Sequence, residues 1–201
     1  MKRLFAFLIA AAFLAGCGGS KTKIEKLDSS AVILAFGDSL TFGTGAGPSE
    51  AYPAVLERSI GRKVVNAGVP GETSGQGLER LPDVLDEMKP GLLILCHGGN
   101  DFLQRLDDAK AASNVRAMIR LARSKGIPVL LLATPKPGLP PSIPKFYGEL
   151  AAELAVPFEE AVIRTVLFDN SLKSDMVHPN GAGYARIAAA VEKVLKKAGA
   201  I

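Results

Sequence analysis

The sequence predicts a three-layer α/β/α fold in which helices cover both faces of a parallel sheet. Four short apolar runs, at residues 31–36, 63–66, 91–96 and 127–133, are nearly continuous. Runs of this kind are expected for strands that are buried on both faces. Amphipathic stretches separate the runs, and this alternation favours right-handed βαβ units. We therefore expect one domain over residues 31–201, without an internal repeat.

The stretches between the apolar runs have helical spacing. Apolar residues three or four positions apart predict helices over residues 78–88, 112–122 and 184–195. Pro82 is expected to interrupt or kink the first of these helices, because proline lacks an N–H and clashes with the preceding turn. Gly126 follows the second helix, as glycine often does at a helix C-terminus.

The composition is that of a globular protein without a nucleic-acid-binding surface. Hydrophobic residues make up 48% of the 201 residues, which is enough for a substantial core. The net charge is only +4, aromatic residues make up 6%, and no block of basic residues occurs. Binding to nucleic acid is therefore not expected.

The N-terminus, residues 1–16, has the parts of a secretory signal peptide. A basic pair is followed by an apolar segment, residues 4–14, that is short for a membrane span. The sequence Leu-Ala-Gly-Cys17 then resembles a bacterial lipobox, which implies cleavage before Cys17 and attachment of lipid to it. Residues 17–30 are polar and predict a flexible tether. The expected location is the bacterial cell envelope, in a Gram-negative cell the outer membrane or a periplasmic face.

Two alternatives concern the only cysteines, Cys17 and Cys96. The N-terminus could be an ordinary signal peptide with an incidental cysteine. If Cys17 carries lipid, Cys96 has no partner, so no disulfide is expected. Cys96 ends an apolar run and is expected to pack as a small hydrophobic residue, with a nucleophilic role beside His97 as the alternative.

Residues suited to catalysis follow the ends of the predicted strands. Gly37-Asp-Ser39-Leu follows the first strand, Gly71-Glu-Thr the second, and His97-Gly-Gly-Asn100-Asp the third. The carboxyl ends of parallel strands share one edge of a sheet, where ligand sites of such folds gather. We therefore expect these distant segments to form one crevice.

Ser39 is the candidate nucleophile of this crevice. A serine hydroxyl attacks a carbonyl efficiently only when a base removes its proton, and His178 is the candidate base. Asp175, three residues before His178, is placed to accept the second imidazole N–H and to stabilise the imidazolium. Two alternatives remain open: the Asp175–His178 pair could be a capping or turn pair ahead of the following helix, and His97 could be the base.

Four blocks in this order resemble the SGNH, or GDSL, hydrolase family. The blocks are Gly37-Asp-Ser39-Leu, Gly71, Gly-Asn100-Asp and Asp175-x-x-His178, and the resemblance covers roughly residues 31–190. It implies the flavodoxin-like SGNH fold and looks closest to the branch of periplasmic lysophospholipase/thioesterases and arylesterases. In this family the oxyanion is bound by the backbone N–H of the nucleophile, a glycine N–H and an asparagine amide.

Those oxyanion donors map onto Ser39, Gly71 and Asn100. Asp38 and Asp101 also lie in the crevice segments, and we interpret both as positioning residues that bind loop backbone. A metal site is not expected, because no histidine or glutamate cluster with ligand spacing accompanies them. An organic cofactor is not expected either.

The resemblance implies a membrane-tethered serine esterase for acyl esters or thioesters, including lysophospholipids. Its partners are then a small acyl-ester or lipid substrate and the membrane that holds its anchor, and we expect a monomer. The proline-rich segment at residues 134–144 is predicted to form a pocket wall, with Leu139, Ile143 and Phe146 as apolar contacts. Two alternatives are a carbohydrate O-deacetylase of the same family and a catalytically silent lipoprotein that binds lipid or cell-wall ligands.

Overall fold

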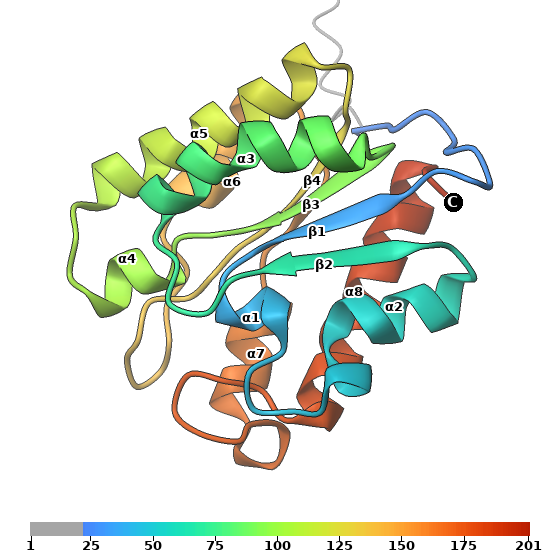
Figure 1. Ribbon diagram of the computed structural model, residues 1–201. Coiled ribbons are helices and arrows are strands. Elements are labelled where there is room, and N and C mark those ends of the chain that lie inside the picture. Colours follow the sequence, from blue (N-terminus) through green and yellow to red (C-terminus); the bar gives the residue numbers. More distant parts are fainter. Residues whose placement is uncertain (1–21) are drawn as a thin grey trace, which may run out of the picture.

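A parallel sheet forms the middle layer of the computed structural model, which describes residues 22–201 (Figure 1). Within these residues the strand order is β2-β1-β3-β4-β5. The strands are β1 (Ile33–Gly37), β2 (Val64–Gly68), β3 (Leu92–Cys96), β4 (Val129–Leu132) and β5 (Phe158–Glu159). The predicted α/β fold is confirmed. Strand β5 was not predicted, because its two half-buried residues form no apolar run.

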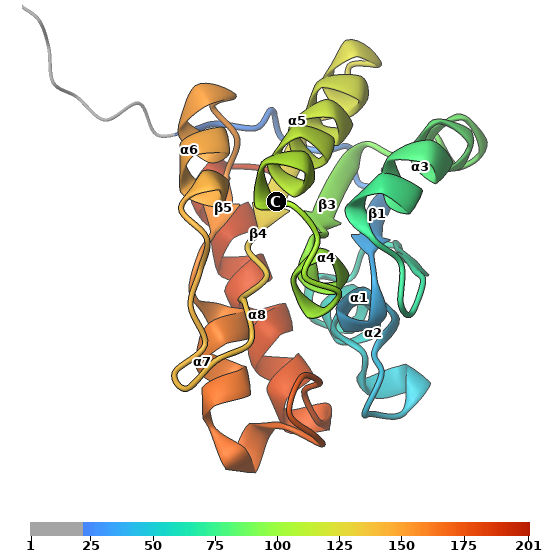
Figure 2. The same cartoon turned by 90° about the vertical axis from the view of Figure 1, so that its left-hand side faces the viewer.

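Helices cover both faces of the sheet (Figures 1 and 2). One face carries α3 (Ser74–Met88), α5 (Asp108–Ser124) and α6 (Phe146–Glu153). The other carries α2 (Tyr52–Ile60), α7 (Val162–Phe168) and α8 (Gly181–Ala198). Along β1, Ile33 and Ala35 belong to the core under α2 and α8, whereas Leu34 and Phe36 belong to the core under α3 and α5. This burial on both faces explains why the strands are continuous apolar runs.

Four short helical segments lie toward the carboxyl ends of the strands. They are α1 (Ser39–Phe42), η1 (Pro48–Glu50), α4 (Gly99–Leu103) and η2 (Asn170–Leu172). Helix α1 begins two residues after the end of β1, and α4 begins three residues after the end of β3. The segments singled out in the sequence therefore meet at one edge of the sheet (Figure 1).

Helix α3 passes through Pro82 without a break, so the predicted interruption is wrong. An internal proline removes one backbone hydrogen bond and costs about 3 kcal/mol. Leu81 and Leu85 of this helix are buried in the core against α5, and burial of a leucine stabilises by about 1.5–3 kcal/mol. Packing of the apolar face therefore outweighs the local preference of the proline.

The described part of the predicted tether, residues 22–30, packs against the domain. The N–H groups of Ile24 and Leu27 donate to the carbonyls of Ala198 and Ala200 at 3.0 and 2.9 Å, and both side chains are buried. This contact lies beside the C-terminus, at the sheet edge opposite α1 and α4 (Figure 1). The predicted signal peptide and Cys17 lie outside the described residues. In residues 22–201 no helix is both long and apolar enough to cross a bilayer.

Candidate active site

Ser39 is the first residue of α1, two residues beyond the end of β1. Asp38 caps this helix, because its Oδ1 accepts the N–H of Leu40 at 3.0 Å. A side chain at Gly37 would place its Cβ 2.3 Å from the carbonyl oxygen of Cys96, so the sharp exit from the strand requires glycine. Asp38 is buried, and desolvation raises the pKa of its carboxyl.

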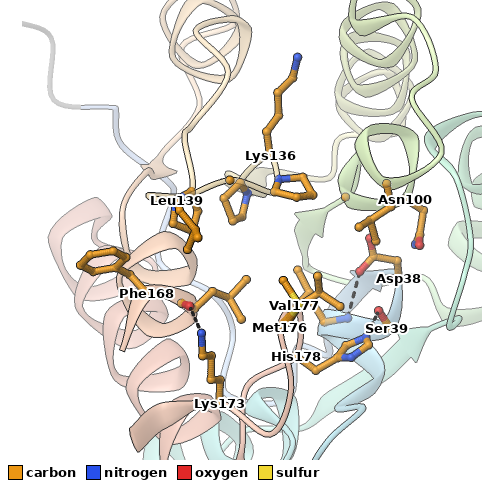
Figure 3. A pocket seen from close by; sticks show the side chains of 18 of the residues that line it. Asp38, Ser39, Asn100, Lys136, Leu139, Phe168, Lys173, Met176, Val177 and His178 are labelled. Atoms are coloured by element: carbon orange, nitrogen blue, oxygen red, sulfur yellow. Dashed lines mark hydrogen bonds between the residues drawn. The ribbon is translucent and has the colours of Figure 1, made fainter. Parts of the chain in front are cut away.

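The structure brings Ser39 together with the two distant residues predicted to activate it. The Oγ of Ser39 lies 3.1 Å from Nε2 of His178, and Nδ1 of His178 lies 2.8 Å from Oδ2 of Asp175. An ionised carboxylate only accepts hydrogen bonds, so Nδ1 carries the proton and Nε2 is free to accept from the serine hydroxyl. Figure 3 shows the imidazole beside Ser39 at the pocket wall.

Asp175 also organises the loop that carries His178. Its Oδ1 accepts the backbone N–H groups of Val177 and His178, both at 2.8 Å. Partial burial raises the pKa of Asp175, but hydrogen bonds from the His178 ring and from these two N–H groups outweigh it, so the net shift is downward. The Asp175 carboxylate therefore forms the turn with one oxygen and contacts the His178 ring with the other.

The two other residues predicted to bind the oxyanion, Gly71 and Asn100, lie in the loop after β2 and in α4. Gly71 is not among the residues that line the pocket beside Ser39. Gly71 has a φ of 80°, a left-handed conformation that favours glycine. The next residue, Glu72, accepts Nδ2 of Asn100 on its backbone carbonyl at 3.0 Å. Asn100 lines the same pocket as Ser39. The backbone of β2 also continues beside β1, since the N–H of Val69 donates to the carbonyl of Gly37 at 3.0 Å.

Asp101 binds the same loop from the side of α4. Its two carboxylate oxygens accept the N–H and the hydroxyl of Ser74 at 2.7 and 2.6 Å. The Ser74 hydroxyl in turn accepts Nδ2 of Asn114 at 3.0 Å. Asp38 and Asp101 bind backbone N–H groups, as predicted, but these groups lie in the first turns of α1 and α3 and not in loops.

His97 and Cys96 lie in the interior and not at the reacting atoms. The His97 ring is fully buried, and its centroid lies 5.3 Å from that of Phe36. Its Nε2 lies 3.1 Å from Oε2 of Glu72, although the two atoms lack hydrogen-bond geometry. Burial raises the pKa of the Cys96 thiol well above its ordinary value. Neither alternative, His97 as base or Cys96 as nucleophile, has support in this arrangement.

Glu72 and Arg80, which form an ion pair beside this site, were not among the predicted site residues. Nε and Nη2 of Arg80 donate to the two carboxylate oxygens of Glu72, each at 2.7 Å. Desolvation raises the pKa of Glu72, but the opposing effects of Arg80 and then His97 are larger together. The net result is a pKa of about 2. Glu72 and Arg80 are eight positions apart in the sequence. They come together because the chain turns from the loop after β2 into α3. A glutamate directly after the predicted oxyanion glycine was the available signal.

The low pKa of Glu72 predicts how stability depends on pH. Its ordinary value is 4.5 and its folded value is about 2, so its contribution is present above about pH 4.5 and is lost as the pH falls toward 2. A shift of this size corresponds to about 3 kcal/mol. We expect Glu72→Gln to flatten the fall in unfolding free energy over this interval, as measured by urea denaturation at several pH values. An unchanged slope would contradict the prediction.

A pocket of about 650 Å³ opens beside Ser39 (Figure 3). Its lining is mostly apolar and includes Leu103, Leu139, Leu167, Phe168, Met176 and Val177. Leu139 and Met176 are 95% and 84% exposed, so they are available to a substrate. The predicted wall is present at residues 135–139 and 141. Ile143 and Phe146 do not line it; they pack instead against the core near α6.

Comparisons with known proteins identify the family of this chain. The sequence profile of the GDSL-like lipase/acylhydrolase family matches residues 35–186. The chain belongs to this family. It is 33% identical over 180 residues to the esterase TesA of Pseudomonas aeruginosa, which covers 82% of this chain and 87% of that protein. It is 31% identical over 156 residues to thioesterase 1/protease 1/lysophospholipase L1 of Escherichia coli K12, covering 74% and 75% of the two chains.

Solved structures extend the similarity to the fold. A crystal structure of TesA aligns with a TM-score of 0.72 at 30% identity, covering 82% of this chain and 98% of that one. AlinE4, an SGNH-hydrolase family esterase, aligns with a TM-score of 0.63 at 32% identity, covering 86% and 98%. The flavodoxin-like SGNH hydrolase fold is confirmed, and the protein is a hydrolase that acts on ester bonds.

Proposed function

We propose that this protein is a serine esterase that hydrolyses acyl esters or thioesters, with Ser39 as the nucleophile. The observation that carries the proposal is the continuous hydrogen-bonded chain from Ser39 through His178 to Asp175, beside an apolar pocket. This chain has the three parts that nucleophilic serine catalysis requires: a nucleophile, a base within hydrogen-bond reach, and a group that orients the base.

The reaction proceeds through an acyl-enzyme. Ser39 Oγ bonds to the carbonyl carbon while Nε2 of His178 takes its proton. The carbonyl oxygen gains negative charge, which the N–H groups of Ser39 and Gly71 and the amide of Asn100 stabilise. When the tetrahedral intermediate collapses, the alcohol or thiol leaves with the proton from His178. Water then attacks the acyl-enzyme by the same route, which releases the acid and restores Ser39.

The pocket favours an acyl chain longer than acetyl. Its apolar lining has room for several methylene groups, each worth about 0.8 kcal/mol when buried. The P. aeruginosa relative is named an esterase and the E. coli relative a thioesterase and lysophospholipase, which supports the same substrate class. We expect kcat/KM for p-nitrophenyl esters to rise from acetyl to octanoyl. Activity confined to acetyl esters of sugars would contradict this and favour a carbohydrate O-deacetylase.

Leu139 offers a test of the pocket wall. We expect Leu139→Ser to lower kcat/KM for octanoyl esters about 3–10-fold, because about 1 kcal/mol of apolar contact is lost, and to leave acetyl esters unaffected. Leu106→Ser is the matched control, since Leu106 is also an exposed leucine but lies outside the pocket lining. Equal losses on both esters would contradict the placement of the acyl chain against this wall.

We also propose that Cys17 carries lipid and holds the enzyme on a membrane of the bacterial envelope. The support is the resemblance of the sequence before Cys17 to a lipobox. Residues 24–27 join the domain at the end of the sheet opposite α1 and α4 (Figure 1). Residues of α1 and α4 line the pocket, so the pocket would face away from the point where the anchor joins. Fatty-acid labelling in a bacterial host tests the anchor. Labelling that persists in Cys17→Ser would exclude it.

A further inference from the structure

A partly buried ion pair lies next to Gly71, the glycine predicted to bind the oxyanion. The side chain of Glu72 is only 6% exposed, and Arg80 binds both of its carboxylate oxygens. Such a two-point contact between a planar guanidinium and a carboxylate fixes orientation as well as distance. The Glu72 side chain is therefore held in one position relative to α3.

The main chain of Glu72 connects this ion pair to both oxyanion donors outside Ser39. Its carbonyl accepts Nδ2 of Asn100 at 3.0 Å, and the preceding residue is Gly71. An amide nitrogen has two hydrogens. The bond to Glu72 uses one of them and leaves the other available to a substrate oxygen. A shift of the Glu72 backbone would therefore move the Gly71 N–H and rotate the Asn100 amide together.

Arg80 connects the same unit to the strand that carries the nucleophile. Its guanidinium lies 4.1 Å from the ring centroid of Phe36, which is in β1 three residues before Ser39. Its Nη2 also donates to the carbonyl of Ala67 in β2 at 3.1 Å. Gly77 leaves room for this cluster, because a Cβ there would lie 2.5 Å from Nε2 of His97.

We propose that Glu72 is a positioning residue for the oxyanion hole. Arg80 fixes the side chain of Glu72, and this side chain fixes the Glu72 backbone. As a result, Gly71 and Asn100 present their N–H groups to one point. This inference rests on the proposed function of Ser39 and adds a residue that does not touch the substrate. It differs from a purely stabilising ion pair in one respect: loss of the Glu72 charge should weaken transition-state binding in molecules that remain folded.

The test compares Glu72→Gln with Glu79→Gln, which removes the same charge from an exposed position in α3. The concentration of active sites is determined first by titration with a fluorophosphonate, so that unfolded protein does not count. Removal of one oxyanion donor costs about 10²–10³ in rate, and displacement should cost less. We expect Glu72→Gln to lower kcat per titrated site about 10–100-fold with KM within about 3-fold. Glu79→Gln should match the wild type.

A trifluoromethyl ketone gives a second readout. Ser39 adds to its carbonyl carbon, His178 receives the proton, and the adduct oxygen becomes an oxyanion. We expect its inhibition constant in Glu72→Gln to rise by the same factor as kcat/KM falls. Arg80→Gln should have a similar effect, and the double variant should be no worse than the stronger single variant.

The outcomes separate this inference from the proposed function. If kcat per titrated site and the inhibition constant are unchanged in Glu72→Gln while its melting temperature falls, the ion pair only stabilises the fold and the inference is wrong. A wild-type protein that neither titrates nor hydrolyses esters would overturn the proposed function, and the inference with it.

Discussion

Ser39→Ala is expected to lower kcat for p-nitrophenyl esters about 10⁴–10⁶-fold, the largest effect of any single change in this protein. The Oγ that lies 3.1 Å from Nε2 of His178 is the atom that would form the acyl-enzyme bond. Alanine removes this atom and leaves the pocket and the proposed oxyanion donors in place. The remaining activity would therefore come from binding and oxyanion stabilisation alone, with KM nearly unchanged.

A covalent probe separates this result from a loss of folding. We expect a fluorophosphonate to add one phosphonyl group to the wild type at Ser39, by mass spectrometry, and none to Ser39→Ala. Ser124→Ala is the control, because Ser124 is an exposed serine at the end of α5, where its hydroxyl donates only to the carbonyl of Leu121. Undiminished turnover in Ser39→Ala would refute the assignment of Ser39 as the nucleophile. A folded wild type that does not react would favour the catalytically silent lipoprotein.

The sequence was most informative where the chain obeys local rules. Strands β1 and β3 are buried on both faces, so their apolar runs were visible without tertiary information. The placement of Ser39 and Asn100 followed from a general property of parallel sheets, namely that sites gather at the carboxyl ends of strands. Strand β5 was invisible because a two-residue strand has no periodicity to detect.

The parts that could not be predicted depend on side-chain packing between elements. No spacing rule relates Glu72 to Arg80, because their contact requires the α3 helix to begin where Asp101 binds Ser74. The burial of His97 beside Glu72 likewise depends on the absence of a side chain at Gly77. These contacts are formed by the fold as a whole, and a local sequence pattern carries little information about them.

Asp175→Asn is expected to lower kcat about 10³–10⁴-fold, which is more than Asp175→Ala. The new amide oxygen can still accept the N–H groups of Val177 and His178 that Oδ1 accepts now. The new amide nitrogen would then face Nδ1 of His178 as a donor. This arrangement requires an unprotonated Nδ1, so Nε2 carries the hydrogen and cannot take the proton of Ser39.

Asp175→Ala should have the opposite balance of effects. The Asp175 side chain is 52% exposed, so water can replace part of its stabilisation of the imidazolium, and we expect a loss of about 10²-fold in kcat. The alanine variant also loses both backbone contacts of the loop, so its melting temperature should fall below that of the asparagine variant.

Nitrogen NMR can test the tautomer directly, because the chain has only two histidines. At a pH where the ring is neutral, the wild-type His178 should carry its proton on Nδ1 and the Asp175→Asn variant on Nε2, while His97 should not change. Small and equal losses of kcat in both variants, with no tautomer change, would mean that Asp175 only shapes the turn. We expect Asp175→Asn to have a lower kcat than Asp175→Ala but a higher melting temperature. This combination requires that the Asp175 carboxylate both orients His178 and holds the loop that carries it.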